Sequence, residues 1–467
     1  MPRSPFGCAC TLLLASVVLP GAARAAWSTD PTANVPVCTA IGDQLPLVAC
    51  TDGAGGMFIA WSDQRSGAHD LYATHLSAQG TVVAGWPVNG LAVCTASGDQ
   101  TNPALVYDDS GGALVIWQDG RSVGAADIYA QHLTSAGTVS PGWPSLASNG
   151  LLLAGAPNKQ FFPVAVGDGA GGALVAWQDL RNGVDENIYA QHVLAGGVIA
   201  PGWSPNGDSL CVASGDQTTP TIASDGAGGA IVAWNDHRGA DLDVYAQHIT
   251  GTGAIAAGWP GAIAGGLAIS TQAMDDGPVT IAADGFGGAY LAWFGTASNT
   301  YRAQRVAGNG NVLGWPSAAS GGLALGVTTN LVQAPVVVAD GAGGAIIAGA
   351  GMFTNASFAV HVGAGGDAAV DWTNSVSSPG AQIEAESYGV SDGFGGVFVV
   401  ANFGLTNSQE SLDLYATHYT SAGALATGWV SVGTPLSTAP GQQALAALVP
   451  DGQGGVLAAW ADTRDSA

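Results

Sequence analysis

Along most of the chain, apolar residues occur in short uninterrupted runs that are bounded by glycine-rich polar turns. Typical runs are "AIVAW" and "ALVIW", and turns such as "SDGAGG" precede them. A strand with one solvent-exposed face would alternate between apolar and polar residues, so these runs predict strands that are buried on both faces. The Asp-Gly turn before a run is typical of a β-hairpin.

The same pattern returns with a mean period of about 57 residues, because seven intervals separate the first Asp-led turn from the last. These turns begin at Asp52, Asp108, Asp168, Asp225, Asp284, Asp340, Asp392 and Asp451. The apolar run after the turn ends in tryptophan at Trp61, Trp117, Trp177, Trp234, Trp293 and Trp460. A second tryptophan position, mostly within "GW", is occupied by Trp27, Trp86, Trp143, Trp203, Trp259, Trp315, Trp372 and Trp429. Periods of this length are typical of propellers, solenoids and arrays.

Each unit contains four candidate strands. A short segment such as "TPTIASD" leads through the Asp-Gly turn into "GGAIVAW", a polar loop leads to "DVYAQHI", and "TGTG" turns back toward the fourth segment. A blade of sheet buried on both faces needs a similar neighbour on each side, and a ring of blades supplies both. We therefore predict an all-β fold, a β-propeller of eight blades with four antiparallel strands each, with seven blades as the alternative. A β-solenoid fits less well, because its coils are usually shorter and lack Asp-Gly hairpins.

The two ends of the chain fall at different phases of the repeat. The last unit stops at "WADTRDSA", before its third strand, whereas "WSTDPTANVPVCTA" begins in the phase of a fourth strand. We expect this N-terminal segment to join the last blade as a clasp that closes the ring. The last blade is then predicted to be incomplete, without its third strand, and the chain to be truncated at the C-terminus.

Residues 1–25 have the features of a secretory signal peptide. Arg3 gives a positive start, "CTLLLASVVLPGAA" forms the apolar region, and residues 23–25 fit the small-x-small cleavage rule. The apolar region is shorter than the roughly 20 residues of a membrane span, so we expect no membrane insertion. Residues 26–467 are predicted to form a single propeller, monomeric and secreted, either extracellular or at the cell surface.

Charge and cysteines narrow the classes of partner. The formal net charge is −24 at pH 7, which argues against nucleic acid, because such partners attract basic patches. Aspartates cap turns, so a turn-rich β protein accounts for most of this charge. Cys38, Cys94 and Cys211 occupy one repeated position, and equivalent positions in different blades lie too far apart for a disulfide. A Cys38–Cys50 disulfide stays open as an alternative in an oxidising compartment.

Two motifs that suggest catalysis have better structural interpretations. The "DGAGG" turn resembles a phosphate loop, but strand and not helix follows it and no lysine is near. Histidine recurs at one third-strand position, at His75, His132, His192, His248, His361 and His418. A catalytic base is needed once, so we interpret these residues as packing or inter-blade hydrogen-bonding groups.

An Asp-x-Arg motif follows the apolar run in several units. It comprises Asp63/Arg65, Asp119/Arg121, Asp179/Arg181, Asp236/Arg238 and Asp462/Arg464. An Arg fork that bridges two carboxylates would clamp the loop between the second and third strands. These loops lie on the rim opposite the Asp-Gly turns, together with the "SGDQ" loops of Asp99 and Asp216. We expect a face dense in carboxylates, where partners bind and where calcium coordination is conceivable, although no compact Asp-x-Asp-x-Asp loop is present.

The repeat fails in units five to seven, which lose Asp-x-Arg. There Arg302 and Arg305 replace the usual Ile and His, which adds both to the candidate binding residues. The non-repeated acids are Glu384, Glu386 and Glu410, all in unit seven. We assign no catalytic residue, no metal ligand and no cofactor other than the conceivable calcium.

The pattern "SDGAGGAIVAW … DVYAQH … GW" resembles the tandem repeats of large exported bacterial proteins that are expected to fold as β-propellers. It has a looser similarity to sialidase-like propellers, but their Asp-box, S-x-D-x-G-x-x-W, is not reproduced because the Trp lies too far from the Asp. The resemblance implies a non-enzymatic scaffold that binds a glycan, protein or surface ligand. The alternative is a propeller-fold glycoside hydrolase or lyase, which would need a convergent pair of acids with separated pKa values.

Overall fold

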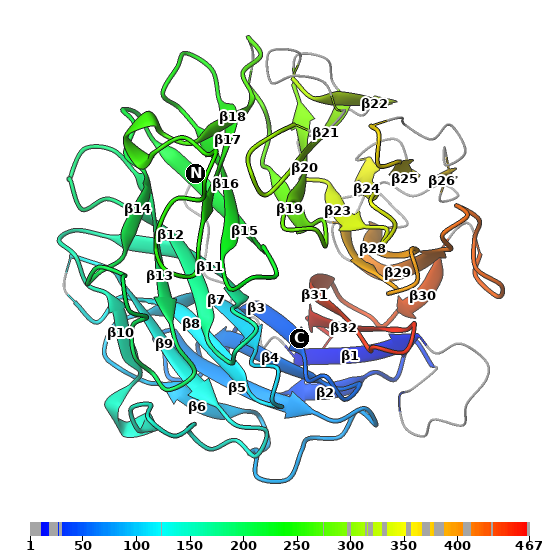
Figure 1. The fold of residues 1–467 in the computed structure, drawn as a ribbon. Helices are drawn as coiled ribbons and strands as arrows, with labels where there is room; N and C mark the ends of the chain where they lie inside the picture. The colour runs from blue at the N-terminus through cyan, green and yellow to red at the C-terminus, as the bar shows by residue number, and fades with distance from the viewer. Residues whose placement is uncertain are drawn as a thin grey trace, which may run out of the picture.

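In this computed structural model, strands β1 to β32 form eight antiparallel sheets of four strands, which stand as blades around a central axis (Figure 1). The structure describes residues 11–17, 27, 30–122, 124–273, 275–296, 300–312, 315, 321–328, 334–351, 356–366, 374–377, 387–404, 412–430 and 433–464. Helix in these ranges is confined to two 3-10 turns, Leu146–Ser148 and Ala262–Ala264. The predicted eight-bladed all-β propeller is confirmed, and the seven-blade alternative is wrong.

The blades are numbered from one (β3 to β6) to eight (β31, β32, β1 and β2). The first strands are β3 (Gln44–Thr51), β7 (Gln100–Tyr107), β11 (Gln160–Gly167), β15 (Gln217–Ser224), β19 (Thr280–Ala283), β23 (Val336–Ala339), β27 (Ser387–Ser391) and β31 (Gln443–Pro450). The second strands are β4 (Met57–Asp63), β8 (Ala113–Asp119), β12 (Ala173–Asp179), β16 (Ala230–Asp236), β20 (Ala289–Gly295), β24 (Ala345–Gly351), β28 (Val397–Gly404) and β32 (Val456–Asp462).

The outer half of each blade contains the two remaining strands. The third strands are β5 (Asp70–Leu76), β9 (Asp127–Leu133), β13 (Asn187–Val193), β17 (Asp243–Ile249), β21 (Thr300–Val306), β25 (Ala356–Val362), β29 (Leu412–Tyr419) and β1 (Thr11–Val17). The fourth strands are β6 (Leu91–Cys94), β10 (Leu151–Ala154), β14 (Asp208–Cys211), β18 (Leu267–Ser270), β22 (Leu323–Thr328), β26 (Asn374–Ser377), β30 (Thr434–Ser437) and β2 (Val35–Cys38).

The first strands line the axis. Each contacts the first strand of the next blade, from β3 and β7 round to β27 and β31, and β31 contacts β3. The contacts therefore close a ring. In blades one to four and eight, the first residue of the first strand pairs with the last residue of the second, as Gln160 pairs with Asp179. We call this end of the blades the Asp-x-Arg rim and the opposite end, where the Asp-Gly turns lie, the Asp-Gly rim.

The second strands are buried on both faces, as predicted. Val115 and Trp117 of β8 cluster with Phe58 of blade one, whereas Ile116 of the same strand clusters with Val175 of blade three. Alternate side chains of a strand point to opposite faces, so each blade packs against both of its neighbours. Full burial of one such side chain contributes about 1.5–3 kcal/mol. Inter-blade packing is thus the main source of stability.

The Asp-Gly turn is a structural turn and not a phosphate loop. Oδ1 of Asp108 accepts hydrogen bonds from the backbone N–H groups of Ser110, at 2.8 Å, and Gly112, at 2.7 Å. A Cβ on Gly112 would lie 2.5 Å from the carbonyl oxygen of Leu133 in β9. The last Gly of the motif is therefore required by the close approach of the third strand.

The last blade contradicts one prediction. Its sheet runs β2, β1, β32, β31, so β1 takes the place of the third strand that was predicted to be missing. All seven residues of β1 pair with β32, from Thr11 opposite Asp462 to Val17 opposite Val456. The apolar run that predicts a signal peptide has the composition of a strand from this repeat, which is why sequence alone did not place it. The clasp by β2 is confirmed.

The ends of the chain are tied together by side chains. The Nε1 of Trp27 donates to the carbonyl of Ala78 in blade one at 2.9 Å. The Nη2 of Arg464 donates to Oδ1 of Asn34, just before β2, at 3.0 Å. The Arg464–Asn34 bond joins residues 430 positions apart within blade eight, and the Trp27–Ala78 bond joins the segment before β2 to blade one.

The four cysteines of the described ranges form no disulfide. Cys38, Cys50, Cys94 and Cys211 are free thiols, so the Cys38–Cys50 disulfide is not formed. Burial raises the pKa of the Cys38, Cys94 and Cys211 thiols, which disfavours their reactive thiolate form. No helix in the described part of the chain combines the length and the apolar character that crossing a membrane requires.

The turn geometry predicts the outcome of a single methyl substitution. Gly112→Ala is expected to lower the free energy of unfolding by about 1–3 kcal/mol, because the new methyl group collides with the Leu133 carbonyl and the Asp108 carboxylate. Gly196→Ala is the matched control, since a Cβ there meets nothing within 4 Å. Urea unfolding of both variants measures the difference, and equal stabilities would contradict this account of the turn.

Candidate functional site

The Asp-x-Arg motif forms a clamp inside each blade that carries it. In blade two, Arg121 donates from Nε to Oδ1 of Asp119 at 2.8 Å and from Nη2 to Oδ2 at 2.6 Å. The indole of Trp117 donates to Oδ2 of the same carboxylate at 2.8 Å. Arg121 also donates to the carbonyl of Asn149, before the fourth strand, at 2.8 Å. Its guanidinium lies 3.8 Å from the ring centre of Tyr129, in a cation–π contact.

The other copies repeat this geometry and correct two expectations. Asp63, Asp119, Asp179 and Asp236 bind Arg65, Arg121, Arg181 and Arg238, and their carboxylates have 0% exposure. These carboxylates therefore do not form a solvent-facing acidic surface. Each Arg fork holds both oxygens of one carboxylate instead of bridging two, because the next Asp has its own donor: Ser122 bonds Asp127 at 2.9 Å.

The exposed aspartates of the "SGDQ" loops connect neighbouring blades. Oδ1 of Asp99 in blade two accepts from the backbone N–H of His69 in blade one at 3.1 Å. Oδ1 of Asp216 in blade four accepts from the N–H of Glu186 in blade three at 3.0 Å. Both predicted binding residues lie on the Asp-x-Arg rim, and each has one oxygen committed to a loop of the previous blade.

Blade five keeps two contacts of the clamp, the indole bond and the carbonyl bond, with different residues. Strand register places Arg302 opposite Trp293, the position that Tyr245 has opposite Trp234, so Arg302 replaces Tyr and not Ile. The indole of Trp293 donates to Asp276 at 3.1 Å. Burial raises the pKa of Asp276 to about 6, and the positive charge of Arg302 opposes this shift.

Arg302 also makes the backbone carbonyl contact that the Arg of the Asp-x-Arg motif makes in other blades. It donates from Nη1 to the carbonyl of Gly321 at 2.8 Å, just as Arg238 donates to the carbonyl of Gly265 in blade four. Arg305 lies at the Asp-Gly rim instead, where it binds Asp284 at 2.8 Å. The structure therefore does not bring Arg302 and Arg305 together in one site.

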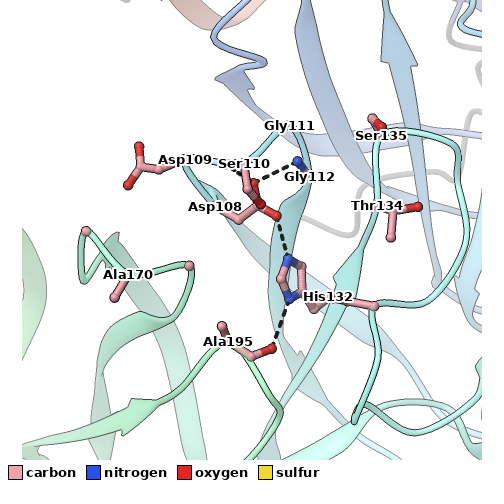
Figure 2. A pocket seen from close by; sticks show the side chains of 13 residues that line it. Asp108, Asp109, Ser110, Gly111, Gly112, His132, Thr134, Ser135, Ala170 and Ala195 are labelled. Carbon is pink, nitrogen blue, oxygen red and sulfur yellow. Dashed lines mark hydrogen bonds and ion pairs between the residues drawn. The ribbon is translucent and has the colours of Figure 1, made fainter.

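Four of the repeated histidines, His75, His132, His192 and His248, form inter-blade hydrogen bonds, as predicted. In Figure 2, Nε2 of His132 lies 2.8 Å from Oδ2 of Asp108, and Nδ1 lies 3.4 Å from the carbonyl oxygen of Ala195 in blade three. The indole of Trp143 donates to the same carbonyl at 2.7 Å. A cavity of about 460 Å³ opens beside this pair, between the Asp-Gly turns of blades two and three. One blade is thus held to the next at the Asp-Gly rim.

These contacts shift the acidity of the turn aspartates. Burial alone would raise the pKa of Asp108, but hydrogen bonds from His132 and from the turn N–H groups bring that pKa below its ordinary value. The same balance lowers the pKa of the equivalent carboxyls Asp168, Asp225 and Asp340. The carboxylates of these turns are therefore held in the ionised form.

A second cavity lies among the first strands, near the Asp-x-Arg rim. Its volume is about 330 Å³, and it is lined by Pro46, Asn102, Pro103, Phe162, Pro163, Val164, Gln178, Thr219 and Pro220. These residues come from blades one to four, and because the first strands line the axis, we call the cavity the axial pocket. It combines an apolar wall with a few amide and hydroxyl groups, which is typical of small-ligand sites.

The backbone of the axial pocket is strained at one repeated position. Asn102, Phe162 and Thr219 have φ of 49°, 53° and 50°, in the left-handed region that costs non-glycine residues about 1–3 kcal/mol. Each lies in the irregular stretch where the first strand shifts register against the second. Asn tolerates this conformation, but an aromatic residue does so rarely. Phe162 is nevertheless 49% exposed, so its ring is available at the pocket.

Polar groups behind the pocket are tied to the neighbouring blade. Oε1 of Gln178 accepts from the N–H of Thr219 at 2.9 Å, and its Nε2 donates to Oε2 of Glu186 at 2.5 Å. Burial raises the pKa of Glu186, while the bond from Gln178 opposes that shift. Gln178 is thus fixed in orientation by two partners and forms a rigid part of the wall.

Blade three also carries the only lysine of the chain. The carbonyl of Lys159 accepts from Leu180, as the carbonyl of Asp216 accepts from His237, so Lys159 occupies the position of the "SGDQ" aspartate. Its side chain is exposed and forms no ion pair with the described residues. Sequence reasoning missed both Lys159 and Phe162, although the replacement of "SGDQTNP" by "APNKQFFP" was a readable signal.

Catalytic and metal-binding sets are not seen in the described ranges. No group of three or more His, Cys, Asp or Glu side chains there is arranged to hold a metal ion. The non-repeated acids Glu384, Glu386 and Glu410 lie outside the described residues. The residues that line the axial pocket include no carboxylate, His or Cys.

Comparisons with known proteins give no family and distant structural likenesses. No protein-family model and no curated protein matches the sequence. An ulvan lyase of polysaccharide lyase family PL25 is 10% identical with a TM-score of 0.46, over 77% of this chain and 89% of the lyase. The fungal lectin of Aleuria aurantia, a six-bladed propeller that recognises fucose, is 10% identical with a TM-score of 0.37, over 83% of this chain and 96% of the lectin.

A third solved structure, a puromycin hydrolase mutant, is 12% identical with a TM-score of 0.40. The match covers 86% of this chain but only 59% of the hydrolase, so this chain spans less than two thirds of its length. At such identities the likeness concerns the fold alone. These likenesses assign neither binding nor catalysis to this chain.

The lowered pKa values of the turn aspartates predict acid sensitivity. A carboxyl whose pKa is lower in the folded state stabilises the fold above its unfolded pKa of about 3.9, and this stability is lost as the pH falls through the folded pKa. We expect this contribution to the free energy of unfolding to be lost as the pH falls below about 4.

The variant Asp108→Asn tests the contribution of one turn. It should be less stable at neutral pH by about 1–3 kcal/mol, because buried donors lose their carboxylate, and it should lose less stability on acidification. Urea unfolding at neutral pH and below about pH 4 measures the free energy of unfolding of the variant and of the unmodified protein. An equal loss on acidification in the variant and the unmodified protein would contradict the assignment.

Proposed function

We propose that this protein is a non-enzymatic, secreted or surface-displayed propeller that binds a glycan in the axial pocket. The observation that carries the proposal is the exposed ring of Phe162, held at a φ of 53° that aromatic residues rarely adopt. Strain of this kind persists where the surroundings enforce it, and it clusters at ligand sites. An exposed aromatic face with oriented amides beside it suits the flat apolar face and the hydroxyl groups of a sugar ring.

The composition of the pocket favours binding over catalysis. Glycoside hydrolysis usually requires two carboxyl groups, about 5–9.5 Å apart, that flank the scissile bond. The lining of the axial pocket offers amides, a hydroxyl and prolines instead. Glu186 is the acid tied to this wall through Gln178. A single tethered carboxylate does not supply an acid and a base.

The position of blade three in the repeat supports the same proposal. Residues with a structural role recur from blade to blade, whereas Lys159 and Phe162 occur once, at the start of β11. The equivalent residues in blade four are Thr219 and Asp216. A lysine in place of the repeated aspartate, next to an aromatic residue where blades two and four carry Asn102 and Thr219, suits a specific ligand site on a repetitive scaffold.

Restoring the repeat residue is expected to remove binding. Phe162→Thr introduces the residue that blade four carries in the same backbone conformation, so the fold should be kept. We expect affinity for a glycan selected by array screening to fall roughly tenfold or more, the usual cost of truncating an aromatic anchor. Titration calorimetry of the purified protein measures the change.

The matched control is Phe394→Ala. Phe394 is 72% exposed but lies in an Asp-Gly turn, at the opposite rim. Loss of binding in the control, or full binding in Phe162→Thr, would overturn the axial assignment. Turnover of any substrate in a parallel glycosidase and lyase panel would overturn the non-enzymatic proposal in favour of the hydrolase or lyase alternative.

A further inference from the structure

Four of the repeated histidines face hydrogen-bond acceptors at both ring nitrogens. Nε2 lies 2.8–3.0 Å from the carboxylate of the blade's own Asp-Gly turn. Nδ1 lies 2.8–3.4 Å from a backbone carbonyl oxygen of the next blade. The four rings belong to His75, His132, His192 and His248, and each is 4–7% exposed.

Neither acceptor can donate a proton back to the ring. A backbone carbonyl has no hydrogen, and Oδ1 of each turn carboxylate already accepts two backbone N–H groups, so the carboxyl acts as an acceptor there. A neutral imidazole carries one N–H and one lone pair, so in either tautomer a lone pair would point at an oxygen. Only a ring with protons on both nitrogens satisfies both partners.

Blade five shows which property this position requires. There Arg305 replaces the histidine, and it donates from Nη2 to Oδ2 of Asp284 at 2.8 Å. Its Nη1 donates to the carbonyl of Gly343, in the Asp-Gly turn of blade six, at 3.1 Å. The replacement keeps both acceptors, one in its own blade and one in the next. Because a guanidinium is always charged, it shows that the junction accommodates a permanent cation.

We propose that the four histidines are imidazolium cations in the folded protein, so that each of the first four blades is locked to the next by a bound proton. The junction of blades five and six is locked by Arg305 and does not depend on a proton. Closure of this half of the ring is then sensitive to pH in a range where a histidine without such partners would be neutral.

The surroundings of each ring contain no competing cation in the contacts that the structure describes. His132 faces Asp108 from its own turn and the indole edge of Trp143, whose ring centre is 5.7 Å away. The cavity beside it adds one further titratable group, Asp109. His75 stacks on Phe58 at 4.0 Å and faces Asp52. These neighbours are neutral or negative, and all of them are compatible with a positive ring.

His418 is an internal contrast. Its Nε2 lies 2.9 Å from Asp392, but its Nδ1 has no hydrogen-bond partner in the part of the chain that the structure describes. One N–H is sufficient there, so the geometry does not require a cation. Two kinds of histidine therefore coexist at equivalent positions.

The direct test is ¹⁵N NMR of the histidine rings in the full-length protein. At about pH 8, well above the value of about 6.5 at which a histidine in water loses its proton, the four rings should each show two N–H groups. His418 should show a neutral tautomer. Single N–H signals from all four rings would overturn the proposal, and this measurement needs no variant.

Two reciprocal variants test the link to ring closure. The proton is held in the folded state only, so stability should be lost as the pH rises, and Tm should fall between about pH 6 and pH 9. His132→Arg should reduce this fall by roughly one quarter, and Arg305→His should increase it by a similar share, if the junctions act independently. An unchanged fall in Tm in both variants would overturn the proposal. Neither outcome depends on glycan binding.

Discussion

The structure depends on one contact that is repeated around the ring: a positively charged or protonated side chain of the third strand, held between the carboxylate of its own Asp-Gly turn and a backbone carbonyl of the next blade. Histidine makes it in blades one to four, and Arg305 makes it in blade five. The apolar faces of the blades provide most of the free energy of association, but they are not directional. The contact at the Asp-Gly rim adds direction, because it fixes the height and rotation of one blade against the next.

At the opposite rim a different set of hydrogen bonds fixes the geometry, and it too is centred on a carboxylate. A buried carboxylate there receives a tryptophan indole and an arginine fork, and the arginine also reaches the loop before the fourth strand. Blade five lost the motif from its sequence, but Asp276 still accepts the tryptophan indole and Arg302 still reaches the loop before the fourth strand. The glycan site that we propose is the axial pocket, where blade three departs from the repeat at Lys159 and Phe162.

Periodicity was sufficient to predict the fold, the blade number and the structural role of the histidines, because each depends on a pattern that returns every blade. Three features were out of reach for physical reasons. The partner of an Arg fork depends on side-chain direction, so the expected bridge between two carboxylates was replaced by one bidentate pair. The placement of β1 depends on which open strand edge an apolar segment meets. The axial pocket, which Phe162 lines, is formed by strands from four blades. These strands are far apart in sequence, so no local sequence pattern predicts the pocket.

The central claim, that the blades form one closed and mutually locked ring, is tested most directly by hydrogen exchange of the indole N–H groups of Trp61, Trp117, Trp177 and Trp234. Each is fully buried and donates to a carboxylate within its own blade. In a locked ring a single blade cannot open alone, so all four protons should exchange at one slow rate that follows global unfolding. Four separate rates, graded from blade to blade as in an open array, would contradict the account.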